Sequence, residues 1–300
     1  METRHWVLIV FLAAALHAHF RGRVRFPLRR ALIDYTVLIA PLNSLLVLFS
    51  KVRTTAYLDP KDFPALQPLQ AHWQEIRDEA MRLNEDGAIR ASTDYNDIGF
   101  NSFFKTGWKR FHLKWYGQDM ASAQQLCPRT VELLNAIPSI KAAMFASLPP
   151  GARLVRHRDP YAGSLRYHLG LVTPNSPQCY IDVDGQHYHW RDGEAIMFDE
   201  TYIHHAENTT DHQRVILFCD VERPVWTPVM TWLNRFFARV VMRAAASQNV
   251  EGEPIGGLNK FFFYAYRVRA KAKTLKTTHR RFYYVSKWVL IIGLLLALFW

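Results

Sequence analysis

The chain has 300 residues, of which 49% are hydrophobic, 14% aromatic and 21% charged. This composition excludes a disordered, collagen-like or low-complexity protein and provides enough apolar surface for one or two cores. Lysine and arginine number 37 against 26 acidic residues, and the resulting net charge of +11 indicates an anionic partner. Three widely separated cysteines without paired spacing indicate a reducing compartment rather than a disulfide scaffold or a zinc ribbon.

Both ends of the chain are apolar, with WVLIVFLAAALHAHF at residues 6–20 and WVLIIGLLLALFW at residues 288–300. Each run is short for a bilayer span, but aromatic residues at the ends of the second run suit the membrane interface, so we expect both runs to be membrane anchors. Basic residues follow the first run and precede the second, which predicts that the segment between them faces the cytoplasm. The alternatives are a signal peptide for the first run and a buried core helix for the second.

Residues 31–49 form a third apolar stretch, interrupted by Asp34, Pro41 and Asn43. Polar side chains are costly at bilayer depth and proline breaks a helix, so we predict an interfacial or re-entrant segment. The predicted domains are an anchor and interfacial region at 1–50, a cytoplasmic domain at 51–230, and a basic helical segment with a C-terminal anchor at 231–300.

The central domain changes from a helical to a β pattern. Apolar residues between Leu69 and Leu83 recur at three- and four-residue spacing and predict an amphipathic helix, and Pro128 begins a second predicted helix. Further along, short β-like runs are separated by Pro, Gly and Asp, which predicts a mainly β core at about 144–222 of sandwich, barrel or jelly-roll type. The predicted strands lie at roughly 152–157, 164–172, 179–183, 186–190, 194–198, 203–207 and 214–221.

A possible metal site lies in this β region. His157 and Asp159 are two residues apart at the end of one β-like run, and His204 begins another. Side chains two residues apart leave a strand on the same face, so this pair and a third ligand from a neighbouring strand fit the 2-His-1-carboxylate facial triad of iron(II) oxygenases. An isolated HxD pattern is weak evidence in a chain with 13 histidines, so the neighbouring residues decide its weight.

Cationic side chains accompany these candidate ligands. Arg214 begins the apolar run RVILFCDV, where a guanidinium that faces inward could bind a dicarboxylate through two parallel hydrogen bonds. Arg166 and His168 alternate on one strand face and fit a grip on the co-substrate and substrate beside the metal. The alternatives are a surface ion pair of Arg214 with Asp211 or Asp220, and a solvated strand face for the other two.

Several motifs together resemble the aspartyl/asparaginyl β-hydroxylase family: LPPGARLVRHRDPYAGSLRYHLGL, WRDGEAIMFDETYIHHAEN and HQRVILFCDVERP. The apolar termini, YNDIGFNSFFKTGWKRFHLKWYG and SAQQLCP narrow the resemblance to the bacterial lipid A 2-hydroxylases of that family. The resemblance implies a double-stranded β-helix fold (a cupin-like jelly roll) with flanking helices. It also implies Fe(2+), the co-substrates 2-oxoglutarate and O2, and a place in the bacterial inner membrane.

The family's functional residues can be carried over to this sequence by position. The resemblance implies the metal and catalytic residues His157, Asp159 and His204, where the aspartate fills a carboxylate position that the animal peptide hydroxylases lack. It further implies that 2-oxoglutarate is bound by Arg214, Arg166 and His168. His205 has no matching ligand role and is expected to lie behind the metal ligands.

The implied reaction hydroxylates C2 of a secondary acyl chain of lipid A, coupled to decarboxylation of 2-oxoglutarate to succinate and CO2. The implied partner is lipid A or a lipopolysaccharide precursor at an anionic lipid surface. We expect its phosphates and acyl chains to contact a mixed basic and aromatic surface that includes Lys105, Trp108, Lys109 and Arg110. The alternative for this segment is a partly buried aromatic helix with solvated lysines.

Other functions fit less well. A peptide aspartyl/asparaginyl hydroxylase remains open, as does a non-catalytic lipid-binding jelly roll. A zinc hydrolase would leave Arg214 unexplained and lacks an evident general base. No nucleic-acid-binding motif is present, so no nucleic-acid partner is predicted, and the sequence does not indicate the oligomeric state. His187 and His189 follow the turn signal Asp184-Gly185 and are predicted to be exposed, whereas the cysteines are predicted to lie in the core.

Overall fold

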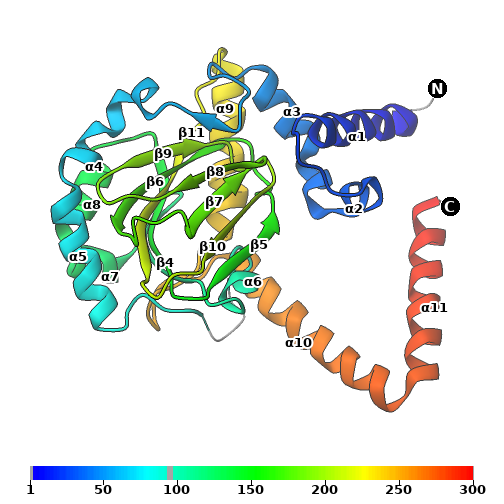
Figure 1. The fold of residues 1–300 in the computed structure, drawn as a ribbon. Coiled ribbons are helices and arrows are strands. Elements are labelled where there is room, and N and C mark those ends of the chain that lie inside the picture. Colours follow the sequence, from blue (N-terminus) through cyan, green and yellow to red (C-terminus); the bar gives the residue numbers. More distant parts are fainter. Residues whose placement is uncertain (1–2, 93–96, 300) are drawn as a thin grey trace.

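The structure of the protein, a computed structural model, describes residues 3–92 and 97–299. Figure 1 shows two antiparallel sheets that face each other, with helices on one side and two helical arms on the other. The larger sheet has the strand order β1-β9-β6-β11-β4-β2-β3 and the smaller sheet the order β5-β10-β7-β8. The strands are β1 (Tyr57–Leu58), β2 (Lys109–Trp115), β3 (Gln118–Asp119), β4 (Ile140–Leu148), β5 (Arg153–His157), β6 (Ser164–Val172), β7 (Cys179–Val183), β8 (Gln186–His189), β9 (Ala195–Phe198), β10 (His204–Asn208) and β11 (Arg214–Glu222).

The helices fall into three groups along the chain. The N-terminal group is α1 (Thr3–Phe20), α2 (Leu28–Ile33), the 3-10 helix η1 (Tyr35–Ile39) and α3 (Ala40–Leu48). The second group is η2 (Pro60–Asp62), η3 (Pro64–Leu66), α4 (Gln67–Ala71), α5 (Trp73–Glu85), α6 (Asn101–Phe104), α7 (Ala121–Leu126) and α8 (Pro128–Asn135). The C-terminal group is α9 (Pro228–Phe237), the π-helical turn η4 (Ala238–Met242), α10 (Gly257–Thr278) and α11 (Arg280–Phe299).

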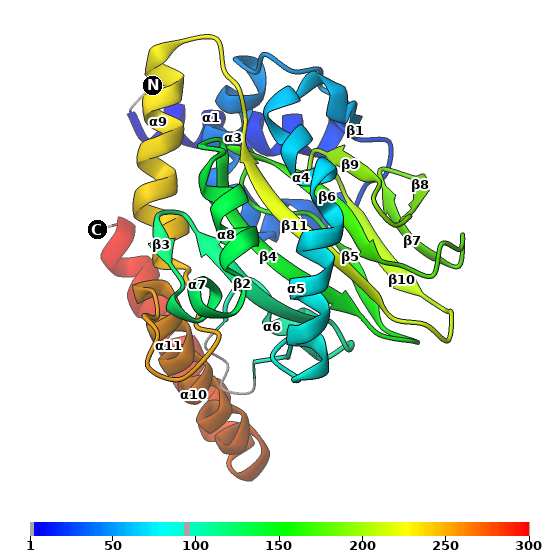
Figure 2. The ribbon, with the colours of Figure 1, turned by 90° about the vertical axis from the view of Figure 1, so that its left-hand side faces the viewer.

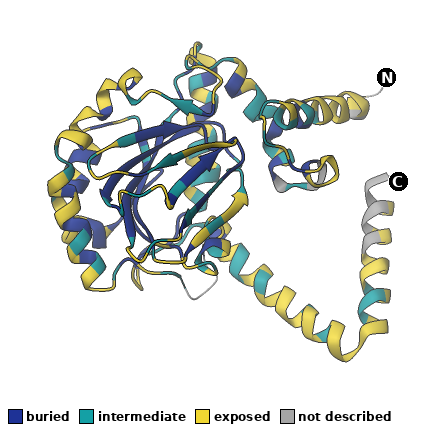
Figure 3. Ribbon diagram, viewed as in Figure 1, coloured by how far each residue is buried: buried dark blue, intermediate teal, exposed yellow. Residues whose placement is uncertain are grey.

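The core lies between the two sheets and beneath the helices that cover the larger one. Strands β4, β6 and β11 are buried on both faces, because α5 and α8 cover the outer face of the sheet that they form (Figure 2). Ile76 and Ala80 of α5 are fully buried there, as their helical spacing predicts. Figure 3 shows the contrast between these buried sheets and the exposed surface of α10. The mainly β jelly-roll core with flanking helices is therefore confirmed.

All seven predicted strands are present, from β5 to β11, and both predicted helices correspond to α5 and α8. The sequence did not predict β2 and β4, nor the two-residue strands β1 and β3. The alanine-rich IKAAMFASL of β4 has low intrinsic β propensity and becomes a strand through its pairing with β2 and β11. The aromatic stretch that suggested a helix forms only the short α6 followed by strand β2.

The predicted terminal membrane anchors find no support. Among residues 3–92 and 97–299, no helix combines the length and the apolar character that a membrane crossing requires. Helix α1 carries His17 and His19 in its last turn, within the first apolar run, and α11 begins with Arg280 and Arg281 ahead of the second run. Trp300, the last residue of the second predicted anchor, lies outside the described residues.

The predicted interfacial segment contains three short helices that pack against the core. Asp34 accepts a hydrogen bond from the Thr36 N–H at 3.0 Å and begins η1, and Pro41 lies at the start of α3. Asn43 does not break its helix. Its side chain donates to the Pro160 carbonyl at 2.6 Å and accepts from the Ala162 N–H at 2.9 Å, which fixes α3 beside the end of β5.

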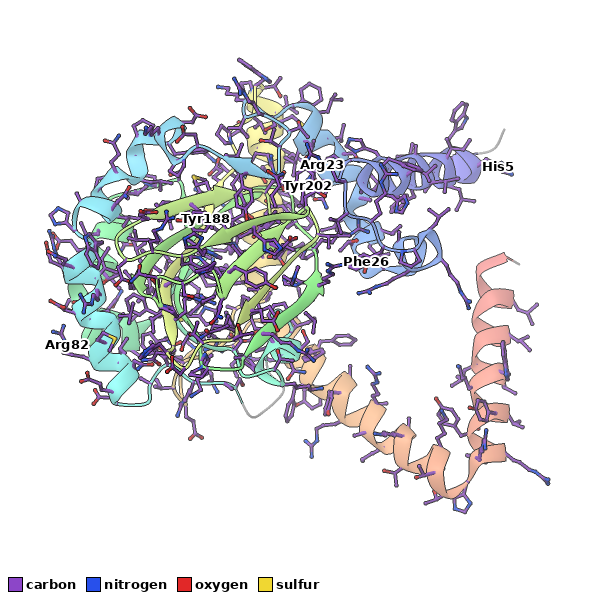
Figure 4. All side chains as sticks on the ribbon, viewed as in Figure 1. His5, Arg23, Phe26, Arg82, Tyr188 and Tyr202 are labelled. Atoms are coloured by element: carbon purple, nitrogen blue, oxygen red, sulfur yellow. The ribbon has the colours of Figure 1, made fainter. Side chains whose placement is uncertain are left out.

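A buried ion-pair network joins the N-terminal arm to the core. Asp199 lies 2.8 Å from Arg223 and 3.2 Å from Arg21, which follows α1. Burial alone would raise the pKa of Asp199, but the two guanidinium groups outweigh this effect and hold the pKa well below its usual range. The Arg21 guanidinium also stacks over the ring of Tyr202, which Figure 4 labels at this junction.

We expect Asp199→Ala to lower the free energy of unfolding by about 3–5 kcal/mol, because it leaves two buried cations without their anion. Since the pKa of Asp199 is depressed, its contribution to stability is present above the unfolded pKa and is lost as the pH falls toward the folded value. Denaturant unfolding measures the effect, with Glu85→Ala at an exposed position as control. Equal stability of the two variants would contradict this account.

Candidate active site

Two strands of the smaller sheet bring the predicted metal ligands together. His157, the last residue of β5, pairs directly with His204, the first residue of β10, and their ring centroids are 4.2 Å apart. Asp159 follows β5, and its backbone N–H donates to the Glu200 carbonyl at 2.9 Å. One ligand atom from each of His157, Asp159 and His204 lies within 4.8 Å of the others. This is the spacing that a mononuclear metal site requires.

The two histidines are oriented for metal binding. Nδ1 of His157 lies 2.7 Å from the Val155 carbonyl, and Nδ1 of His204 lies 2.9 Å from the Tyr202 carbonyl. A carbonyl only accepts hydrogen bonds, so each Nδ1 carries the proton and each Nε2 keeps its lone pair for a metal. Burial lowers the pKa of both rings, to about 3 for His204, where the neighbouring His157 adds to the effect. Both rings are therefore neutral at physiological pH.

Arg166 of β6 holds the carboxylate of the triad in place. Its Nη2 donates to Asp159 at 2.8 Å and also to Glu200, and its Nε lies 3.1 Å from Asp220. Burial alone would raise the pKa of Asp159, but Arg166 together with the two histidines keeps it below its ordinary value. Asp159 is thus an ionised, oriented ligand. Arg166 was predicted to contact the co-substrate; in this structure three carboxylates engage its guanidinium, which makes it a positioning residue for the triad.

Asp220 completes this buried cluster. It accepts a hydrogen bond from the Tyr116 hydroxyl at 2.8 Å, and burial raises its pKa against the opposing effects of Arg166 and Tyr116. Glu200 also accepts from Ser164 at 2.7 Å. The sequence did not identify Glu200 or Asp220 as site residues, although Glu200 follows the predicted strand β9 and Asp220 lies near the end of the predicted strand β11.

A pocket inside the jelly roll extends from the triad to Arg214. Arg214 is almost completely buried, and among the described residues its Nε and Nη1 have no hydrogen-bond partner. Burial lowers the pKa of its guanidinium to about 10, so it remains charged at neutral pH. Its guanidinium stacks 4.3 Å above the centroid of Trp190, a pocket residue that the sequence analysis missed. A buried cation with free donors fits an anionic ligand, and the alternative of a surface ion pair is excluded.

His168 lines the same pocket. Its ring packs against Phe198 and Phe218, and within the described part of the chain neither ring nitrogen forms a hydrogen bond. Burial, with smaller effects from Arg166 and Arg214, lowers its pKa well below the usual range. The neutral ring therefore offers one donor and one acceptor to a ligand. The register places it on β6 opposite Phe218 of β11, which lies between Arg214 and Asp220, the partner of Arg166.

The predicted basic and aromatic surface is only partly at the surface. Lys105 and Lys109 are exposed. Arg110 is buried and donates to Asp97 at 3.0 and 2.7 Å, so it cannot also reach a lipid phosphate in this structure. Trp108 is buried and lines the pocket beside His157. The difference from the prediction arises because Arg110 lies in strand β2, where Arg110 to Leu113 are all buried, and not on an exposed helix face.

The remaining histidines and cysteines lie outside the pocket lining. His205 points to the other face of β10, where Nδ1 is 3.8 Å from Asp182. His187 is exposed and lies 3.0 Å from the same carboxylate, in a hairpin whose turn has positive φ at Asp184 and Gly185. Cys127, Cys179 and Cys219 are free and buried, as predicted.

A jelly roll that carries two histidines, a carboxylate and a buried arginine in one pocket defines the class of iron(II)- and 2-oxoglutarate-dependent hydroxylases. The sequence profile of the aspartyl/asparaginyl beta-hydroxylase family matches residues 70–224. The chain therefore belongs to the aspartyl/asparaginyl beta-hydroxylase family, and it is a 2-oxoglutarate-dependent hydroxylase.

Two relatives illustrate the range of this similarity. The ornithine lipid ester-linked acyl 2-hydroxylase of Rhizobium tropici is 34% identical over 64% of this chain and 69% of its own length. The human aspartyl/asparaginyl beta-hydroxylase is 27% identical over 54% of this chain, but this covers only 22% of the human protein. Among solved structures, a Pseudomonas putida prolyl-4-hydroxylase has a TM-score of 0.34 and 19% identity, covering 52% of this chain and 88% of that protein.

The residues present fit both implied groups. Two neutral Nε2 atoms and an ionised carboxylate suit Fe(2+), and Arg214 with His168 suits the carboxylates of 2-oxoglutarate. Bound iron and 2-oxoglutarate would supply the electrons that activate O2 for hydroxylation of a C–H bond, with 2-oxoglutarate oxidised to succinate and CO2. The protein orients the ligands through Val155, Tyr202 and Arg166, and its apolar pocket walls exclude water.

We expect His157→Ala and Asp159→Ala to weaken divalent metal binding by more than about 100-fold, since loss of an outer partner alone costs 10- to 100-fold. Anaerobic calorimetric titration of the protein with Co(2+) measures the affinity. The matched control is His205→Ala, which removes the histidine next to His204 on the opposite strand face. Equal affinity of His157→Ala and the unmodified protein would remove this residue from the ligand set.

We expect Arg214→Leu to weaken 2-oxoglutarate binding by about 10- to 150-fold, because hydrogen bonds to charged groups contribute about 1.5–3 kcal/mol. Arg214→Lys should recover part of the loss through its charge, without the paired donors. Equilibrium binding to the metal-loaded protein measures the effect, with the exposed Arg191→Leu as control. An unchanged dissociation constant for Arg214→Leu would place the co-substrate elsewhere.

Proposed function

We propose that this protein hydroxylates C2 of an acyl chain of a membrane lipid, and that its substrate is a secondary acyl chain of lipid A or of a lipopolysaccharide precursor. The observation that carries the acyl substrate is the similarity to an acyl 2-hydroxylase over most of both chains. That relative is named for an ornithine lipid, so the choice of lipid A rests on the apolar arm and the basic charge of this chain. The proposed setting is the bacterial inner membrane, with the active site on the cytoplasmic side.

A second hollow supports a lipid substrate. It lies between the N-terminal arm and the end of β5, and Asp159 lines it as well as the pocket of the jelly roll. Its other walls combine small and apolar side chains from α1, η1 and α3 with polar and charged ones, which are His17, Arg21, Thr36, Asn43, Ser44, Arg158 and Thr201. The apolar members are Ala15, Ala18, Val37, Ala40 and Val47. A route of this kind brings an alkyl chain, rather than a folded peptide loop, toward the metal carboxylate.

The outer surface of the same arm is apolar. Trp6, Leu8 and Val10 of α1 are at least half exposed, and Leu38 and Leu48 are about three-quarters exposed. A water-soluble surface rarely presents so many large apolar side chains together. An arm that is apolar outside and meets the active site inside suits an enzyme that takes its substrate from a bilayer.

The charge of the chain supports a phosphorylated head group. The net charge is +11, and α10 alone carries basic side chains along much of its length, from Lys260 to Lys276. Such a surface complements lipid phosphates and an anionic leaflet. We therefore propose lipid A, which combines phosphates with secondary acyl chains, in preference to a lipid without phosphate.

Peptide hydroxylation is the second candidate, and similarity to the human aspartyl/asparaginyl beta-hydroxylase favours it. The match covers 22% of the human protein. Asp159 argues against this candidate, because the resemblance implies that the animal peptide hydroxylases lack a carboxylate at this position. A non-catalytic lipid-binding jelly roll is not favoured, because the ligand and co-substrate residues are all in place.

Mass spectrometry of lipid A from cells with and without this protein tests the proposal. We expect a mass gain of one oxygen atom on a secondary acyl chain, lost in Asp159→Ala and retained in His205→Ala. Purified protein is assayed in parallel for succinate formation with Fe(2+) and 2-oxoglutarate. Succinate formation without a lipid A shift would contradict the lipid A substrate and direct the search to peptides or other lipids.

A further inference from the structure

Helix α9 and the turn η4 that follows present an apolar stripe to the outside. Val229, Trp232, Phe236 and Val240 are 68, 63, 51 and 53% exposed, respectively. Spacings of three and four residues place them on one helix face. The Trp232 and Phe236 rings stack on each other with centroids 5.4 Å apart. Trp226, just before the helix, is 67% exposed and extends this α9 stripe.

The opposite face of α9 is firmly attached to the jelly roll. Asn234 is buried, donates to the Gly163 carbonyl at 3.0 Å and accepts from the Tyr161 hydroxyl through its backbone carbonyl at 2.9 Å. Phe237 stacks on the Tyr161 ring at 5.0 Å. Because these contacts fix the rotation of the helix, the α9 stripe cannot turn inward to bury itself. Figure 2 shows α9 at the outer edge of the molecule.

Basic side chains border the α9 stripe. A shallow groove along it is lined by Lys51, Arg235 and Arg239 together with Trp226, Trp232 and Phe236, and no acidic residue contributes to this lining. The Lys51 ammonium lies 5.5 Å from the centre of the Trp226 ring. Arg235 donates to Glu222 at 2.8 Å, whereas Arg239, which lines the groove, and Arg243, one turn further along, are exposed. This charge pattern complements an anionic partner.

The apolar surface continues from α9 to α3. The Trp226 N–H donates to the Phe49 carbonyl at 2.9 Å, and Ser50 pairs with Val225 in an isolated bridge. Leu48, at the end of α3, is 74% exposed next to this junction. The α9 stripe is thereby continuous with the arm whose inner side meets Asp159.

We propose that the α9 stripe docks on an anionic lipid bilayer, with Trp226 and Trp232 at the level of the head groups and Arg239 and Arg243 beside the phosphates. Tryptophan and arginine on one face of a helix are typical of segments that lie in the membrane interface. The choice of a bilayer as partner rests on the proposed membrane-lipid substrate. The surface that docks is assigned from the exposed α9 stripe and the basic groove beside it. A helix that lies in the interface needs no membrane-crossing segment.

A fluorescent label on the stripe tests this assignment in the full-length protein. All three native cysteines are buried, so Val229→Cys provides a selective site for an environment-sensitive dye. The matched control carries the label at Glu85→Cys on α5, on a different side of the molecule (Figure 1). Vesicles of phosphatidylethanolamine with phosphatidylglycerol provide the anionic bilayer, and vesicles of phosphatidylcholine provide the neutral one.

We expect anionic vesicles to shift the emission of the label at position 229 to the blue and raise it several-fold, with little change at position 85. Arg239→Gln with Arg243→Gln should weaken this response, as should added salt, since both reduce the attraction to anionic lipid. Trp232→Ser should also weaken the response. Because the Trp232 side chain is exposed, the circular dichroism spectrum of this variant should match that of the unmodified protein.

Two results would overturn the assignment. The protein could co-sediment with anionic vesicles while the label at position 229 keeps its emission in water, which would place the contact elsewhere. The label could instead respond to protein concentration without vesicles, which would make the partner a second copy of this chain. The experiment uses neither metal nor 2-oxoglutarate, so its failure is distinguishable from failure of the lipid A assay.

Discussion

The site depends on one buried cation. Arg166 lies among Asp159, Glu200 and Asp220, and its guanidinium also stacks 3.6 Å above the centroid of Phe218. Each of these carboxylates would be costly to bury alone, and each becomes acceptable because the same guanidinium is its partner. The cluster connects β6 and β11 with Glu200, two residues after β9, and Asp159, two residues after β5. The metal carboxylate is therefore held by the larger sheet, while both metal histidines come from the smaller one.

The register of the larger sheet divides the pocket into two ends. Arg166 pairs with Asp220 across β6 and β11, and His168 pairs with Phe218. Arg214 lies six positions before Asp220 on β11, so side chains of the same strand face reach from the triad to the far end of the pocket. The first cation is neutralised by carboxylates and the second is left with free donors. Two arginines of one pocket thus differ in role because only one of them has partners within the protein.

Sequence patterns recovered the parts of this structure that depend on local chemistry. The strands from β5 to β11 are bounded by Pro, Gly and Asp, and the HxD spacing makes His157 and Asp159 neighbours at a strand end, so both could be predicted. Strand β4 could not, because its alanines become a strand only through pairing on both sides. The burial of Arg110 could not be predicted either, since it depends on hydrogen bonds to Asp97 and to the distant Ser247.

The segment between β9 and β10 connects the N-terminal arm to the metal site. Asp199 binds Arg21 of the N-terminal arm, and the next residue, Glu200, binds Arg166. Both carboxylates are almost completely buried, and the Glu200 carbonyl also accepts the Asp159 N–H. A displacement of the arm that breaks the Arg21 contact would therefore act on a residue directly bonded to the one that orients the metal carboxylate. The arm and the triad are positioned by adjacent residues, so a movement of the arm and the geometry of the metal ligands are physically linked.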